Sequence, residues 1–383
     1  MKVFLQSIFL QLLLTPYIGY RGYQALPPKR WLRWPFIGLL ALELAIFLFG
    51  FCFVKTLPDQ LLIPIYYICN TWYIASLYLT MALLCIEVLR FTHRRWPWFP
   101  HWVTTHGQAV KSALFVGIAL GITVLMIHAN WVVNHPVVRH QYLTIPKQVA
   151  GRDSLTIVIM TDLHIGEMIG KRLVQRYVAL SNAQHPDLVV WVGDWLDYES
   201  RFAEKAHVEE DLRQLQAPLG VYAVNGNHEY RANRFAKYRW IRQTGATLLV
   251  DSVAQPDSTF YLIGRDDLVN RKRRGLHGLL EGVDTRKPLI VLDHQPLRFS
   301  ESVMNGIDLT LCGHTHNGQF WPYPLVMKLI YECPYGYYRR ADSQFYVSSG
   351  IGFAGPPYRV GTRSELVVLH IRFEGVTHST GSR

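Results

Sequence analysis

Four long apolar stretches lie in the first third of this chain and restrict what it can fold into. They cover residues 3–20, 35–54, 62–88 and 112–133. A helix needs about 20 apolar residues to cross a bilayer, so the second and fourth stretches fit one span each, the third is long enough to tilt, and the first is marginal. We therefore predict a transmembrane anchor of about four helices in residues 1–133.

The first stretch has a second interpretation, as a signal peptide with Lys2 as its basic start. No small-x-small cleavage site follows it, and three more apolar stretches come after it. Both observations favour a retained span.

Charge is distributed unevenly along the chain. Residues 1–133 contain ten Lys and Arg but three Asp and Glu, whereas the remainder contains 29 and 25. Most of the net charge of +11 therefore belongs to the anchor, where basic residues act as topology signals, and no nucleic-acid partner is expected. Two basic loops are predicted to face the cytoplasm, the first with Arg21, Lys29, Arg30 and Arg33 and the second with Arg90, Arg94 and Arg95. Everything after Val133 is then expected outside.

The pattern changes after a polar linker, which we place at residues 134–153. Short β-rich runs, such as SLTIVIM, DLVVWVG and PLIVLDH, now alternate with stretches of helical periodicity. Continuous apolar runs of this length are typical of strands buried on both faces, and their alternation with helices indicates an α/β domain. We place this domain at residues 154–375, followed by a polar tail at 376–383.

Polar side chains cluster directly after five of these apolar runs. They are Asp162 and His164, then Asp194 and Asp197, then Asn227 and His228, then His294, and finally His314 and His316. Because open α/β sheets bind their ligands beyond the carboxyl ends of strands, we expect these groups to converge on one site. His314 and His316 are two positions apart, a spacing that points both side chains the same way in an extended segment.

Seven of these residues are candidate metal ligands: two aspartates, one asparagine and four histidines. They exceed what one tetrahedral zinc ion takes from a protein, and no thiolate is evident. Mixed nitrogen and oxygen donors suit two borderline divalent ions that share a carboxylate, which is the arrangement used to hydrolyse phosphoesters.

The ordered motifs DxH, GDxxD, GNHE, a single His and GHxH resemble the calcineurin-like metallophosphoesterase superfamily over residues 154–373. The segments GHTHNGQFWPYP and YVSSGIGFAGPPYRVGTRSELVVLHI, with the multispan anchor, resemble membrane-associated bacterial phosphodiesterases. That branch is similar to UDP-2,3-diacylglucosamine pyrophosphatases and to cell-envelope phosphodiesterases. Asn317 and Ser364 depart from the usual pattern, at positions that affect loop shape and substrate range.

The resemblance implies a four-layer α/β/β/α sandwich and a binuclear metal centre. One metal would be held by Asp162, His164, Asp194 and His316, and the other by Asp194, Asn227, His294 and His314. In the same way, His228 would contact the phosphoryl group and protonate the leaving group, and Asp197 would orient His228. A site of nitrogen and oxygen donors accepts Mn, Fe, Co or Zn, and we expect Mn²⁺ to support activity in vitro.

Other residues around the site have two interpretations each. Arg265, Arg359 and Arg363 are candidate phosphate contacts, because arginine grips phosphate with two hydrogen bonds. The basic cluster NRKRRG is either a solvated loop or a contact to lipid headgroups. The segment WPYPLVMKLIY either packs in the core or, if exposed, forms a hydrophobic lip beside the metals. Cys312 and Cys333 could form a disulfide, although packing is the simpler expectation.

The sequence thus predicts a membrane-anchored binuclear-metal phosphoesterase. We expect it to hydrolyse a phosphodiester or pyrophosphate bond in a lipid-linked or cell-envelope substrate, at the extracytoplasmic face of a bacterial inner membrane. One alternative is a cytoplasm-facing nucleotide-diphosphate-lipid pyrophosphatase, and another is a non-catalytic metal-binding sensor module. The natural substrate, the metals and the oligomeric state stay open.

Overall fold

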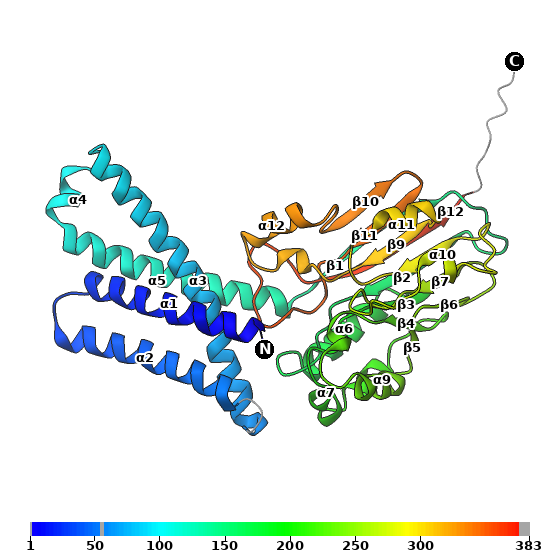
Figure 1. Cartoon of the computed structure of the whole chain (residues 1–383), viewed down its shortest axis with the longest axis horizontal. Helices are drawn as coiled ribbons and strands as arrows, with labels where there is room; N and C mark the ends of the chain where they lie inside the picture. The colour runs from blue at the N-terminus through cyan, green and yellow to red at the C-terminus, as the bar shows by residue number, and fades with distance from the viewer. Residues whose placement is uncertain (1, 54–56, 375–383) are drawn as a thin grey trace, which may run out of the picture. The chain divides into compact units, whose positions relative to one another are not determined.

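The computed structural model describes residues 2–53 and 57–374 (Figure 1). The predicted polar tail lies outside these residues. Contacts divide the chain into two compact units. The first ends at Asn130 and includes Gly355–Pro357, and the second contains Trp131–Ala354 and the residues from Tyr358 onward.

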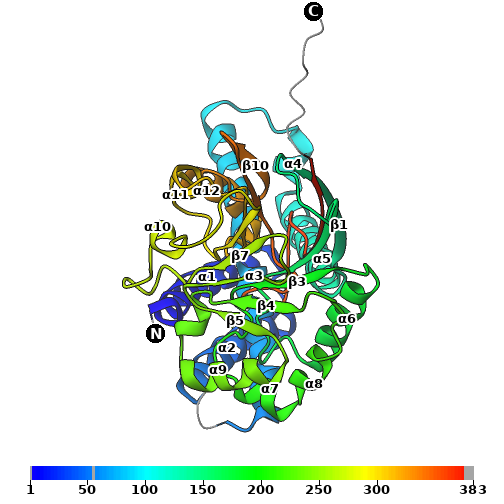
Figure 2. The same ribbon diagram turned by 90° about the vertical axis from the view of Figure 1, so that its right-hand side faces the viewer.

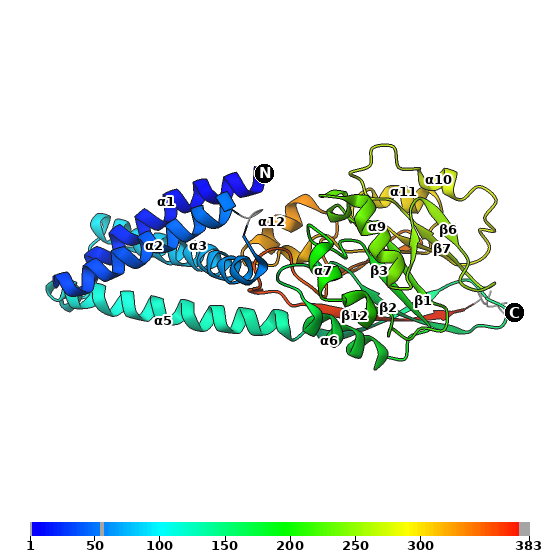
Figure 3. The same cartoon turned by 90° about the horizontal axis from the view of Figure 1, so that it is seen from below.

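The first unit is helical, as the apolar stretches predict. Its helices are α1 (Lys2–Ala25), α2 (Arg30–Phe53), α3 (Asp59–Arg95), the short α4 (His101–Thr105) and α5 (Gly107–Asn134). Figure 1 and Figure 3 show α1 and α2 side by side, and α3 contacts both of them and crosses them at an angle. Among the described residues, three segments are long and apolar enough to cross a membrane: Arg30–Gly50, Asp59–Arg95 and Gly107–Asn134. Helix α1, which contains the marginal first stretch, is not among them.

Helix α1 is less apolar because it carries polar side chains that are buried against α3. Gln11 and Thr15 are buried in the helical unit. The Gln11 side-chain amide donates to Ser76 Oγ of α3 over 2.9 Å, and Trp72 Nε1 donates to Thr15 Oγ1 over 3.0 Å. Interhelical hydrogen bonds of this kind hold helices together where the hydrophobic effect is weak. Helix α1 is therefore joined to α3 by polar contacts.

The second unit contains two six-stranded mixed sheets. The first has the order β1-β12-β2-β3-β4-β5 and the second β10-β11-β9-β8-β7-β6. The strands of the first sheet are β1 (Val137–Ile145), β2 (Ser154–Met160), β3 (Leu188–Val192), β4 (Val221–Val224), β5 (Thr247–Leu249) and β12 (Glu365–Phe373). Those of the second are β6 (Ser252–Ala254), β7 (Tyr261–Gly264), β8 (Leu289–Leu292), β9 (Leu309–Cys312), β10 (Gly336–Arg340) and β11 (Ser343–Val347).

Strand β1 forms where the sequence pattern suggests a polar linker. It pairs in parallel with β12, from Val137 opposite Glu365 to Ile145 opposite Phe373. Because β1 is an edge strand and seven of its nine side chains are exposed or partly exposed, its apolar pattern is weak. The second unit's first strand therefore begins within a few residues of the end of α5.

Each sheet packs against the other sheet on one face and against helices on its opposite face, which gives four layers. Ile157 of β2 and Leu292 of β8 belong to one core cluster between the sheets. The opposite face of the first sheet packs against α6 (Lys171–Asn182), α8 (Val208–Leu212) and α9 (Arg234–Gln243), and that of the second against α10 (Leu276–Leu279) and α11 (Phe299–Met304). Figure 2 shows these two helix groups on opposite sides of the sheets. The four-layer α/β/β/α prediction is confirmed.

Candidate metal centre

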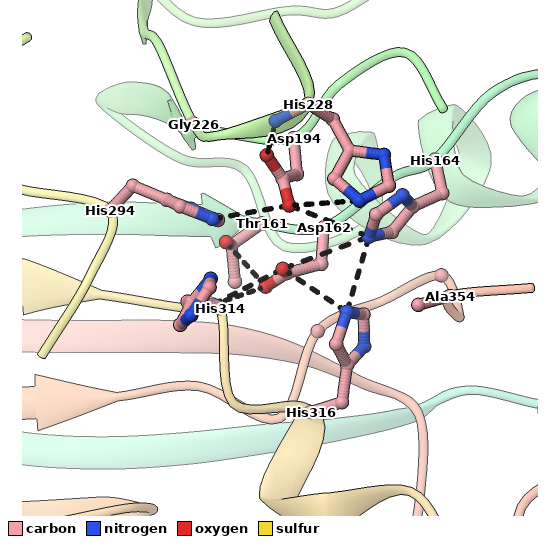
Figure 4. Close-up of polar contacts among 12 residues, drawn as sticks. Thr161, Asp162, His164, Asp194, Gly226, His228, His294, His314, His316 and Ala354 are labelled. Atoms are coloured by element: carbon pink, nitrogen blue, oxygen red, sulfur yellow. Dashed lines mark hydrogen bonds and ion pairs between the residues drawn. The ribbon is translucent and has the colours of Figure 1, made fainter. Parts of the chain in front are cut away.

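The predicted ligands come from the loops at the carboxyl ends of five strands. Asp162 and His164 follow β2, Asp194 follows β3, Asn227 follows β4, His294 follows β8, and His314 and His316 follow β9. Within each sheet the adjacent strands that carry ligands run parallel, so these ends share an edge. Figure 4 shows six of the seven side chains converging on one region. The predicted convergence therefore occurs.

Five of these ligand positions have an unusual backbone conformation. Asp162, His164, Asp194, His314 and His316 have φ between 46° and 73°. A residue other than glycine in this left-handed region costs about 1–3 kcal/mol, and such residues cluster at functional sites. The result also corrects the expected extended geometry of the GHTH pair. Strand β9 ends at Cys312, and both histidines reach the site through a tight turn.

The first half of the site contains Asp162, His164 and His316. The two imidazole Nε2 atoms lie 3.1 Å apart, and His316 Nε2 lies 3.3 Å from Asp162 Oδ1. Two buried imidazole nitrogens that face each other at this distance need a proton or a cation between them, because two lone pairs repel. Their arrangement beside a carboxylate suits a metal ion.

The second half contains His294, His314 and Asn227. Asp194, His294 and His314 offer donor atoms that all lie within 4.8 Å of one another. Asn227 Oδ1 is buried and has no hydrogen-bond partner among the described residues. A buried amide oxygen without a donor is costly unless a cation satisfies it. These residues therefore fit a second metal ion.

Asp194 lies between the two halves. Its Oδ2 atom is 3.2 Å from His294 Nε2 and 3.8 Å from His164 Nε2. Its Oδ1 atom accepts a hydrogen bond from the His228 backbone N–H over 2.8 Å. Burial alone would raise the pKa of Asp194, but the neighbouring histidines lower it well below its usual value. The side chain is thus an anionic group placed where a bridging carboxylate is needed.

Hydrogen bonds with backbone and hydroxyl groups orient the side chains of the predicted metal ligands. His294 Nδ1 lies 2.7 Å from the Val192 carbonyl oxygen, to which it donates, and this leaves Nε2 as the acceptor that faces the site. Thr161 Oγ1 donates to Asp162 Oδ2 over 2.8 Å. The backbone N–H of His314 lies 3.1 Å from both Asp162 carboxylate oxygens.

Glu229 has a role that the sequence motifs do not specify. Its buried carboxylate accepts hydrogen bonds from the backbone N–H groups of Asp194 (2.9 Å), Gly226 (2.7 Å) and Leu196 (3.3 Å). It therefore ties the loop after β3 to the loop after β4. A Cβ atom at Gly226 would lie 2.2 Å from Asp194 Oδ1, so only glycine permits this approach. The fourth residue of GNHE is the available sequence signal, and its acceptor role requires the fold.

His228 faces the centre without belonging to the predicted ligands. Its Nδ1 atom lies 3.0 Å from Asp197 Oδ1 and 2.7 Å from the Asp197 carbonyl oxygen, and its Nε2 atom lies 4.0 Å from Asp194 Oδ2. Burial lowers the pKa of His228, but the two aspartates outweigh burial and raise it above its usual value. Hydrogen bonds from His164 and His228 outweigh burial at Asp197 and lower its pKa, so Asp197 stays a carboxylate.

The three arginines proposed as phosphate contacts lie in different environments. Arg265 is 3% exposed, and its Nη1 atom lies 2.8 Å from Glu301 Oε2. Arg359 is 1% exposed and donates to the His316 carbonyl oxygen over 2.9 Å and the Gly352 carbonyl oxygen over 3.0 Å. These placements favour structural roles for both. Arg363 is exposed.

The basic cluster and the cysteines also have defined environments. Arg273 forms two hydrogen bonds to the Asp293 carboxylate, at 2.9 and 3.0 Å, so it is neither solvated nor free to meet a headgroup. Cys312 and Cys333 are buried as free thiols. The disulfide is thus absent, and packing is their role.

Comparisons with known proteins agree with this geometry. Residues 155–318 match the calcineurin-like phosphoesterase family. A Danio rerio protein described as a transmembrane protein with metallophosphoesterase domain is 30% identical over 374 residues, covering 92% of this chain and 83% of that protein. An uncharacterized metallophosphoesterase of Campylobacter jejuni is 28% identical over 345 residues, covering 85% and 89%. The chain also aligns with the crystal structure of a dimetal phosphatase from Danio rerio, at 14% identity and a TM-score of 0.35. The alignment covers 57% of this chain and 99% of that chain.

The chain belongs to the calcineurin-like metallophosphoesterase family. It is a metal-dependent phosphoester hydrolase whose N-terminal region has helices that can span a membrane.

Proposed function

We propose that this protein hydrolyses a phosphodiester or pyrophosphate bond in a lipid-linked or cell-envelope substrate, with two divalent ions in its active site. The observation that carries the proposal is the position of Asp194, whose Oδ2 atom faces His164 on one side and His294 on the other. A single carboxylate between two sets of donors is the arrangement that holds two ions a few ångströms apart.

The donor sets divide the ligand roles. Asp162, His164 and His316 would hold one ion, Asn227, His294 and His314 the other, and Asp194 both. When bound, the ions supply positive charge for the phosphoryl oxygens and lower the pKa of the attacking water. Mn²⁺ is the ion that we propose for activity in vitro.

The protein's own proton donor is His228. Asp197 accepts a hydrogen bond from His228 Nδ1 and favours the imidazolium form, in which Nε2 faces the centre and carries the proton to be transferred. We assign to His228 the transfer of a proton to the leaving oxygen as the bond to phosphorus breaks. Positioned proton transfer of this kind contributes about 10²–10⁴-fold to the rate.

Activity with and without metal tests the proposal. The purified chain with Mn²⁺ should hydrolyse bis-p-nitrophenyl phosphate, lose that activity after dialysis against a chelator, and regain it when Mn²⁺ is added back. Release of p-nitrophenolate measures the rate. Full activity in the chelated protein, with its metal content shown to be zero by mass spectrometry, would contradict the proposal.

We further propose that the catalytic unit lies outside the cytoplasm, at a bacterial inner membrane. Arg90, Arg94 and Arg95 lie in the last turns of α3, and the positive-inside rule assigns this basic end to the cytoplasm. Helix α5 starts at Gly107, twelve residues after Arg95. The unit that follows α5 is then outside, whether or not α1 crosses the membrane.

Reporter fusions after residue 374 decide between this side and the cytoplasm-facing alternative. Alkaline phosphatase, which folds outside, should be active there, and a fluorescent protein that matures only in the cytoplasm should stay dark. The opposite pattern would favour a pyrophosphatase acting on a cytoplasmic nucleotide-diphosphate lipid. The non-catalytic sensor is disfavoured because all seven predicted donors are present.

A further inference from the structure

Helix α12 (Tyr323–Ile330) and the residues before it form a dense apolar surface. Six large apolar side chains within ten positions are exposed: Trp321, Tyr323, Leu325, Val326, Leu329 and Ile330. Leu329 is 87% exposed, whereas Met327 is buried and anchors the helix. The other exposed large apolar residues of the described catalytic unit are scattered along its sequence. The expectation that this segment packs in the core is therefore wrong, and a patch of this kind marks an interaction site.

The patch is fixed to the metal centre. His316 lies in the short turn η2 (His316–Gly318), and α12 begins five residues after Gly318. Gly318 has φ +75°, and a Cβ atom there would lie 2.6 Å from the Pro324 nitrogen. Beyond the other end of α12, the Pro334 carbonyl oxygen accepts a hydrogen bond from Thr315 Oγ1 over 2.6 Å. Both ends of α12 are thus held against the turn that supplies His316.

A helix that can span a membrane leads directly into the catalytic unit. Helix α5 is long and apolar enough to span, and Val133 in its last turn is fully buried in the core that includes Val158 of β2. Two residues separate Asn134 from the start of β1 at Val137. The three Cα–Cα steps from Asn134 to Val137 span at most about 11 Å, so the chain leaves no room for a flexible linker between α5 and the catalytic unit.

The composition of the patch matches the interface of a bilayer. Trp321 and Tyr323 precede the aliphatic residues, and both types are enriched at the headgroup level of membranes. Lys328 is exposed, and its long side chain can keep its charge in water while its stem lies against apolar groups. No acidic residue occurs between Gln319 and Tyr331, so anionic headgroups meet no repulsion there.

We propose that α12 is an interfacial helix whose exposed side chains insert into the surface of the bilayer that α5 spans. The metal centre then works at the level of the lipid headgroups. The insertion follows from the exposure of the patch and the missing linker. The consequence for substrate, a phosphoester carried by a membrane lipid, rests on the proposed function.

Photocrosslinking in the full chain tests the insertion. The variant Leu329→p-benzoylphenylalanine is reconstituted into vesicles of phosphatidylethanolamine and phosphatidylglycerol with an alkyne-tagged phosphatidylcholine, and illuminated. The matched control is Phe235→p-benzoylphenylalanine, because Phe235 is 75% exposed on α9. We expect a lipid adduct at position 329 in about tenfold excess over position 235. Equal adducts, no adduct at 329, or an adduct to a second protein chain would overturn the insertion.

A second measurement separates the insertion from the proposed function. The double substitution Leu325→Glu and Leu329→Glu should reduce hydrolysis of a vesicle-embedded phosphodiester lipid by about tenfold, because two carboxylates oppose insertion. Hydrolysis of soluble bis-p-nitrophenyl phosphate should stay unchanged, and Phe235→Glu should alter neither rate. Unchanged lipid hydrolysis in the double variant would overturn the link to substrate. If the wild-type chain hydrolyses neither compound, the proposed function fails, while the crosslinking result still decides the insertion.

Discussion

Replacement of Asp194 by asparagine is expected to reduce kcat/KM for bis-p-nitrophenyl phosphate by about 10³-fold or more. The amide keeps the shape of the side chain and the Oδ1 acceptor for the His228 N–H. It replaces the negative Oδ2, which faces both His164 and His294, with a neutral NH₂ group that donates and cannot bridge two cations. The loss therefore comes from the ions and leaves the packing intact.

Metal analysis provides the independent readout for Asp194→Asn. Mass spectrometry should find about two divalent ions per wild-type chain and fewer in the variant, since each half of the site loses a shared anionic ligand. Asp342→Asn is the matched control, because the Asp342 side chain is fully exposed. Wild-type metal content together with wild-type activity in Asp194→Asn would remove the basis for the bridging role.

Substitution of His228 by alanine is expected to reduce the rate of hydrolysis by an amount that depends on how readily the leaving group departs without a proton. A departing alkoxide needs a proton, so hydrolysis of an unactivated alkyl phosphodiester should fall by about 10³-fold. Nitrophenolate leaves readily without one, so hydrolysis of bis-p-nitrophenyl phosphate should fall by only about tenfold. Both rates are measured with the same metal-loaded protein, and His277→Ala, at an exposed position of α10, is the control. An equal loss for both substrates would assign His228 to binding and not to proton transfer.

The pH profile adds a test of Asp197 as a positioning residue. A proton donor is active below its pKa, so the rate should fall as the pH rises through the pKa of His228. Asp197 raises that pKa through its hydrogen bond and charge. Asp197→Asn should therefore move the alkaline limb to lower pH, which a purely structural loss would not do.

Local sequence was sufficient to predict which polar residues the structure brings together, because each of them directly follows a strand that is visible as an apolar run. Each predicted ligand follows a buried apolar strand, and within each sheet parallel strands bring their carboxyl ends to one edge. The meeting of the two sets of ligands also depends on how the two sheets pack. The two-sided burial of β3 and β8 likewise appears in the sequence as continuous apolar runs. The α/β class and the expectation that the polar strand ends converge could thus be derived from pattern, whereas the four-layer sandwich and the division of the ligands between two metals came from the family resemblance.

Features that depend on long-range packing could not be derived in this way. Strand β1 alternates weakly because it is an edge strand, and its pairing depends on β12, more than 200 residues later. Arg265 and Arg359 are chemically suited to bind phosphate. Only the fold shows that Glu301 and the His316 carbonyl oxygen already accept their hydrogen bonds. The segment around α12 resembles core in its sequence, because an apolar run has the same composition whether protein or lipid covers it.

The left-handed backbone of the ligand loops restricts which residue types can serve as ligands. Outside glycine, asparagine, aspartate and histidine are the residues that adopt this conformation most readily. The five predicted ligands with left-handed backbone, Asp162, His164, Asp194, His314 and His316, all belong to this group. A glutamate or cysteine at these positions would have to meet the coordination chemistry and a less favourable backbone at once. Aspartate and histidine at these positions therefore meet two requirements at once: the coordination chemistry of the proposed ions and the backbone conformation of the tight turns.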